Sequence, residues 1–67
     1  PSYNVGDVLV PKINNVKLMQ DPSDASGVIV SLQKQDEMIY MGMDENGFIR
    51  VETAHGGGWV KKVLVWR

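Results

Sequence analysis

Hydrophobic residues in this chain come in short runs, and residues that favour turns separate them. In two of the runs, residues 37–43 and 48–53, successive side chains alternate between the two faces of a strand. Met38, Tyr40 and Gly42 fall on one face of a strand, and Ile39 and Met41 fall on the other. No segment offers ten residues with apolar positions at helical spacing, so the pattern predicts no α-helix. The pattern therefore predicts strands over residues 8–10, 16–19, 27–32, 37–43, 48–53, 59–60 and 61–66.

The turn signals between the runs are equally regular. Gly6-Asp7 precedes the first strand, and residues 21–27 (DPSDASG) form a cluster of turn-formers. Asn46-Gly47 is the strongest hairpin signal in the chain, and residues 54–58 predict the next turn. The run 27–32 is continuously apolar, which is typical of a strand buried on much of both faces. We expect one all-β domain over residues 1–67, a small barrel or sandwich of five to seven antiparallel strands, with at most a 3₁₀ turn near residues 61–63.

Composition narrows the classes of function. The chain has 67 residues, 43% of them hydrophobic, which supports one small core. It has no cysteine, so disulfides and thiolate metal sites are excluded. A formal net charge of −1 gives no basis for attraction to nucleic acid. No apolar run approaches the roughly 18 residues of a membrane span. We expect no cofactor and no metal.

The order of the motifs resembles that of bacterial SH3 domains, an SH3-like barrel family, over roughly residues 8–65. The matching segments are VKLMQDPS (residues 16–23), SGVIVSL (26–32), QKQDE (33–37), GFIRV (47–51) and GWV (58–60). Three positions depart from the family pattern, where arginine, glycine and tryptophan are usual: Met19, Gln35 and Phe48.

The resemblance implies an SH3-like barrel that acts as a non-catalytic binding or targeting module. Such modules are commonly attached to cell-wall hydrolases or envelope proteins, and some recognise peptidoglycan peptides. The expectation is therefore a bacterial protein of the cell envelope or a secreted one that binds a wall component, with a cytoplasmic location left open. Other members mediate only protein contacts, so a structural or protein-interaction domain is the alternative.

We expect the ligand site in the groove between the loop of residues 21–26 and the hairpin of residues 44–46. Its candidate walls are the aromatic residues Tyr40, Phe48 and Trp59, and its candidate polar residues are Asp21, Asp24 and Asp44. A second interpretation of Asp21 and Asp24 is that they cap turns through bonds to the backbone. The residue types and positions of Phe48 and Trp59 favour a place in the core or a half-buried one over a place in the ligand site.

The remaining candidates have structural interpretations. Gly56, Gly57 and Gly58 are followed by Trp59 rather than by a helix, so they predict a hairpin turn and not a phosphate loop. His55 lacks an evident catalytic partner and is expected to be exposed on that turn. Together these features favour a protein that is not an enzyme.

Two further features bear on the alternative function. Trp66 is the first residue we suspect of contacting another protomer or partner, although it could instead pack across the barrel opening. Because Met41 and Met43 share a face opposite Met38, at least one of these sets is expected to be partly exposed. The oligomeric state is left open.

Overall fold

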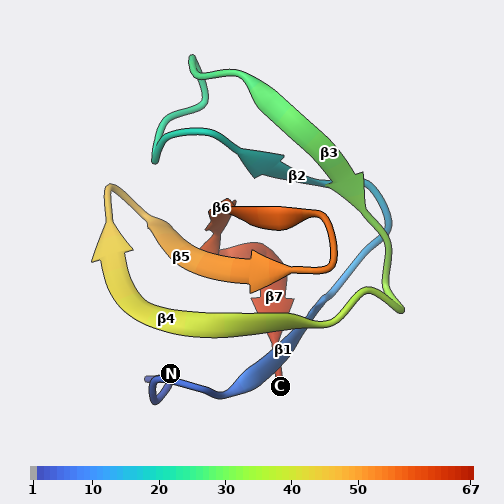
Figure 1. The fold of residues 1–67 in the computed structure, drawn as a ribbon, viewed down its shortest axis with the longest axis vertical. Coiled ribbons are helices and arrows are strands. Elements are labelled where there is room, and N and C mark those ends of the chain that lie inside the picture. Colours follow the sequence, from blue (N-terminus) through green and yellow to red (C-terminus); the bar gives the residue numbers. More distant parts are fainter. Residues whose placement is uncertain (1) are drawn as a thin grey trace.

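A computed structural model describes residues 2–67. These residues form seven strands and, as their only helix, one turn of 3₁₀ helix (Figure 1). In chain order they are β1 (Val8–Pro11), β2 (Val16–Met19), β3 (Val28–Leu32), β4 (Met38–Glu45), β5 (Phe48–Thr53), β6 (Gly56–Lys61), η1 (Lys62–Leu64) and β7 (Val65–Trp66). The expected all-β class, the strand number and the 3₁₀ turn near the C-terminus are confirmed.

All recorded strand pairs are antiparallel, and they give one curled sheet in the order β3-β2-β6-β5-β4-β1-β7. Figure 1 shows β4 and β5 curving along one side of β6, and the β2–β3 hairpin on the other. β3 and β7 end the order and do not pair with each other within residues 2–67. The sheet is thus a half-barrel with two free edges.

The concave face of the sheet holds the core. Along β4, Met38 and Tyr40 are buried whereas Ile39, Met41 and Met43 are exposed, as the alternation predicts. The main cluster of buried side chains comprises Leu9, Val16, Leu18, Leu32, Met38, Tyr40, Ile49, Val51, Val60 and Val65. Because these residues come from all seven strands, the core sets the curl of the sheet.

A bulge in β4 bends that strand around the core. Tyr40 pairs with Val51 and Asp44 pairs with Ile49, so four steps on β4 oppose two on β5. Gly42, with φ of +87°, lies at the bend. The bend lets the Tyr40 hydroxyl donate to Asp44 Oδ1, although four residues of straight strand span about 13 Å.

The β4–β5 turn confirms the hairpin predicted at Asn46-Gly47. Both residues have positive φ, 56° and 78°, as a tight two-residue turn requires. Asp44 and Glu45 belong to β4, so the loop itself is shorter than the expected four residues.

The prediction that residues 54–58 form a turn is wrong for its last three residues. β6 begins at Gly56, and Gly56, Gly57 and Gly58 pair with Thr53, Glu52 and Val51. Only Gly56 among these has positive φ, at 103°. The turn is therefore made by Ala54 and His55, and His55 is exposed on it as expected.

The prediction that residues 27–32 are buried on both faces is also wrong. β3 is an edge strand, and Val28 and Ile29 are 49% and 40% exposed. An apolar run cannot distinguish a central strand from an edge strand, because both are rich in β-branched residues.

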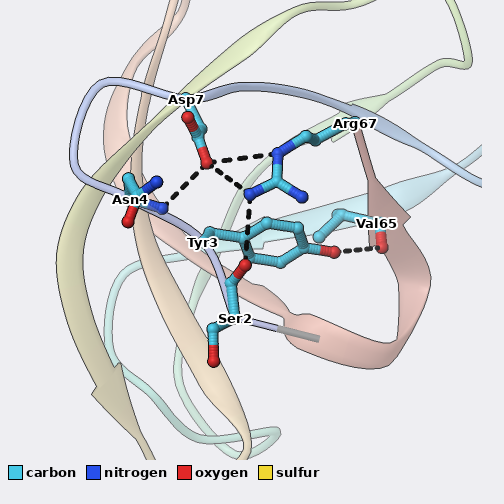
Figure 2. Close-up of polar contacts among 6 residues, drawn as sticks. All are labelled: Ser2, Tyr3, Asn4, Asp7, Val65 and Arg67. Atoms are coloured by element: carbon cyan, nitrogen blue, oxygen red, sulfur yellow. Dashed lines mark hydrogen bonds and ion pairs between the residues drawn. The ribbon is translucent and has the colours of Figure 1, made fainter.

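The two ends of the chain are tied together (Figure 2). The Arg67 guanidinium donates to Asp7 Oδ2 from Nε at 3.2 Å and from Nη2 at 2.8 Å, and to the Ser2 carbonyl at 3.1 Å. It lies 5.0 Å from the centre of the Tyr3 ring, whose hydroxyl donates to the Val65 carbonyl. The N-terminal segment is thereby held against the last strand.

Nowhere in residues 2–67 does a helix reach the length and apolar character needed to cross a bilayer.

Candidate functional site

The convex face of the sheet carries a second apolar cluster, separate from the main core. Met19, Phe48 and Trp59 are 5%, 5% and 6% exposed and pack together. They come from β2, β5 and β6, which are neighbours in the sheet. The Arg50 guanidinium lies over this cluster, 5.9 Å from the centre of the Trp59 ring, and the loop that follows β2 begins directly after Met19.

That loop, residues 20–27, is closed by its serines. Ser26 Oγ donates to the carbonyls of Ser23 and Asp21, at 2.9 and 3.1 Å, and accepts the Asp21 N–H at 3.2 Å. Ser23 Oγ accepts the Ala25 N–H at 3.1 Å. No side-chain bond from Asp21 or Asp24 to the backbone is found within residues 2–67, so serines, not aspartates, cap these turns there.

Two contacts hold the loop across the convex face. Asp24 pairs with Lys61 Nζ at 3.0 Å, and Asn46 Nδ2 donates to the Pro22 carbonyl at 3.0 Å. The second contact joins the loop directly to the β4–β5 hairpin, the two elements between which the sequence places a groove. The loop and the hairpin are therefore in contact.

Beside these contacts, a groove of about 280 Å³ opens where β2 and β6 separate. The two strands pair only at Met19 and Trp59, and they diverge toward Lys17 and Lys61. The apolar residues that line the groove are Val16, Met19, Val28, Phe48 and Leu64. We call this the β2–β6 groove.

The polar lining of the β2–β6 groove is mainly basic. It consists of Asn15, Lys17, Asp24 and Lys61. Lys17 is exposed and takes part in none of the ion pairs within residues 2–67, whereas Lys61 is paired with Asp24. A groove with apolar walls and two lysines can hold a small amphiphilic anion.

The predicted site residues divide into two groups. Asp24 and Phe48 line the β2–β6 groove, and Trp59 packs against Phe48 beside it, with Arg50 5.9 Å from the centre of the Trp59 ring. Asp21 is exposed in the loop and does not line the groove.

Tyr40 and Asp44 belong to a different cluster. Asp44 accepts hydrogen bonds from the Tyr40 hydroxyl and from Lys62 Nζ, the latter at 2.9 Å. These two bonds, the Tyr40 bond first, lower the pKa of Asp44 from its ordinary value near 3.8. The same bond raises the pKa of Tyr40. In this cluster the polar groups of Tyr40, Asp44 and Lys62 bind one another, and the bond between Tyr40 and Asp44 spans the bend of β4.

Sequence reasoning missed seven of the nine groove residues, namely Asn15, Val16, Lys17, Met19, Val28, Lys61 and Leu64. The alternation of β2 does place Lys17 on the same face as Met19, and this signal was available. The role of Leu64 depends on η1 turning back toward β2, which no local pattern indicates.

A second hollow, of about 480 Å³, lies where β4 begins and β5 ends, at the far end of these strands from the Asn46-Gly47 turn. Its lining includes Asp36, Glu37, Glu52 and His55. Within the described residues no three acidic or histidine side chains are grouped so as to hold a metal ion. Asp36 caps its own turn, because its Oδ2 accepts the Gln33 N–H at 2.7 Å.

Trp66 is 53% exposed on β7, with Lys12 Nζ 5.4 Å from the centre of the ring. Its neighbour Val65, not Trp66, packs into the core.

Comparisons of the chain with protein-family models, with curated proteins and with solved structures gave no match.

Proposed function

We propose that this chain is a non-catalytic binding module and that its ligand site is the β2–β6 groove. The observation that carries the proposal is the combination of a partly apolar groove with two lysines on the outer face of a small rigid sheet. Binding sites are typically concave, largely apolar and equipped with a few polar groups. Met19 and Phe48 form the apolar wall, and Lys17 and Lys61 supply the charge.

The ligand we propose is a component of the bacterial cell wall, peptidoglycan first. The support is the resemblance of residues 16–23, 26–32, 47–51 and 58–60 to bacterial SH3 domains. Two of these segments, residues 16–23 and 26–32, include groove residues Lys17, Met19 and Val28. A cell-envelope or secreted location belongs to the same proposal.

Sedimentation with purified sacculi tests this function, with two variants of one strand. Val28 and Ile29 are both exposed on β3, but only Val28 lines the groove. Val28→Glu places a carboxylate in the groove, and Ile29→Glu makes the same change outside it. We expect the wild type and I29E to sediment with sacculi and V28E to remain in solution. Absence of wild-type binding, or equal loss in both variants, contradicts the proposal.

A second function, protein interaction, is favoured by a different surface. On the outer face of β4, β1 and β7, Val8 pairs with Ile39 and Val10 pairs with Trp66, so their side chains form an apolar stripe. Val8 and Trp66 are 47% and 53% exposed. Light scattering distinguishes this function: a dimer that Trp66→Ala converts to a monomer supports it, and a monomeric wild type that captures no partner contradicts it.

A further inference from the structure

We infer that the β2–β6 groove binds the carboxylate at the end of a short peptide, between Lys17 and Lys61. This inference rests on the proposed function and specifies the chemical group that the site recognises. Two ammonium groups and one carboxylate line the groove, which leaves an excess of one positive charge. The whole chain has a formal net charge of −1, so this local excess runs against the overall charge. A singly charged anion complements it.

The existing ion pair leaves the groove lysines available. Asp24 binds Lys61 at 3.0 Å, but the Asp24 side chain is 75% exposed. An exposed pair is weak because water and salt screen it, so a ligand carboxylate can share or displace Asp24. Lys17 has no ion-pair partner to give up within residues 2–67.

The size and walls of the groove favour the end of a chain. Its volume of about 280 Å³ lies at the lower limit of the roughly 300–1,000 Å³ found for small-ligand pockets. Such a space holds one or two small residues at a time. Met19, Val28 and Phe48 offer apolar contact to a small side chain next to the carboxylate. A phosphodiester within a wall polymer has chain on both sides and fits less well.

The direct test uses two probes that differ only in their C-terminal group, which is charged in one and neutral in the other. N-acetylated dialanine with a free carboxylate, and the same peptide with a C-terminal amide, are titrated into the full chain labelled with ¹⁵N. We expect the free acid to bind about tenfold more tightly, because each exposed ion pair contributes up to about fivefold. At about 1 M salt the preference should largely vanish, since the screening length falls to about 3 Å. Equal binding of acid and amide at low salt overturns the inference.

Four variants, one of them a control, locate the carboxylate. Lys17→Gln and Lys61→Gln are each expected to weaken binding of the free acid by about three- to fivefold. Lys34→Gln is the matched control, because Lys34 is exposed but does not line the groove. Asp24→Asn removes the competing carboxylate and is expected to tighten binding by about twofold. If K34Q weakens binding as much as K17Q, or if D24N weakens it, the assignment of the site is wrong. Amide spectra show which variants keep the fold.

Two further outcomes separate this inference from the proposed function. Sedimentation with sacculi in the absence of any preference for the free acid overturns the carboxylate inference and leaves the wall-binding function. A preference for the free acid in a chain that does not sediment with sacculi supports the carboxylate site and overturns the wall assignment. Tighter binding of glycerol phosphate than of the free acid also contradicts the inference.

Discussion

Gly58 lies against Leu18 so closely that a Cβ atom on the glycine would be 2.8 Å from Leu18 Cγ and 2.8 Å from the Met19 carbonyl oxygen. The absent side chain is what lets β2 approach β6 at Met19 and Trp59, the only residues that the two strands pair. Beyond that point the strands separate and the β2–β6 groove opens. Gly58 therefore sets how closely β2 approaches β6 beside the groove.

Gly58→Ala should destabilise the fold by about 1–3 kcal/mol, as overpacking of a fixed backbone does. Gly57→Ala is the matched control, because the added Cβ there meets only the flexible ends of Glu52 and Arg50. We expect it to change the free energy of unfolding by less than about 0.5 kcal/mol. Urea unfolding of both variants measures the difference, and equal costs would show that the approach of β2 to β6 is not limiting.

Gly42→Ala should be costly for two reasons that can be separated. Its φ of +87° is unfavourable for a residue with a side chain, and the added Cβ would lie 2.5 Å from Val5 Cγ2. The backbone cost is about 1–2 kcal/mol, and the collision adds to it. Gly47→Ala, with φ of +78° and no atom within 4 Å of the Cβ position, should show the backbone cost alone.

Val5→Ala should relieve the collision in the Gly42→Ala background. Val5 is 71% exposed, so the single change is expected to cost less than about 0.5 kcal/mol. The double variant should then be more stable than the sum of the two single effects indicates. Thermal or urea unfolding of the four proteins gives this coupling, and strict additivity would contradict the contact between Val5 and the bend of β4.

The bond between Arg67 and Asp7 should make stability sensitive to acid. The Asn4 N–H, at 2.8 Å, and then Arg67 lower the pKa of Asp7 from its ordinary value near 3.8. A carboxyl group with a lowered pKa in the folded state stabilises above its unfolded pKa, and that contribution is lost as pH falls through the folded pKa. Arg67→Gln should lower stability at neutral pH, and the difference from wild type should shrink below about pH 4. A difference that is constant from pH 7 to pH 2 would contradict this account.

The bond between Tyr40 and Asp44 should make stability sensitive to alkali. It raises the pKa of Tyr40 above its ordinary value of 10.0, because the phenol must donate to a carboxylate. The contribution is present below pH 10 and is lost as pH rises through the folded pKa. Tyr40→Phe should be less stable than wild type at pH 7, with the gap closing above pH 10. Ultraviolet titration of the phenol, with Tyr3 retained, should show an absorbance step at raised pH that Y40F lacks.

Local sequence patterns could predict most of the fold. Alternation placed Met38 and Tyr40 on the face of β4 opposite Met41 and Met43, without indicating which face is buried, and Asn46-Gly47 located its hairpin, because both signals depend only on neighbours in the chain. The edge position of β3 could not be predicted, since it depends on which strands pair. The role of Gly58 is also non-local, because the residue it must accommodate, Leu18, lies forty positions earlier.

The candidate site was only partly predictable. Asp24 and Phe48 do line the groove with Trp59 packed beside it, since Asp24 pairs with Lys61 and Phe48 packs against Trp59. Tyr40 and Asp44 were expected with them but form their own cluster with Lys62. Tyr40 pairs with Val51 and packs into the core on the concave face, so it is on the other side of the sheet from Phe48 and Trp59. The serines that close the loop were overlooked in favour of aspartates, although both residue types can cap a turn.

The most direct test of the groove is an NMR titration of the ¹⁵N-labelled chain with soluble peptidoglycan fragments. The account predicts that the largest amide shift changes fall on residues that line the β2–β6 groove, Lys17, Met19, Val28, Phe48 and Lys61 among them. It also predicts little change around Val8, Ile39 and Trp66. Shift changes centred on Trp66, or none at saturating fragment, would contradict it.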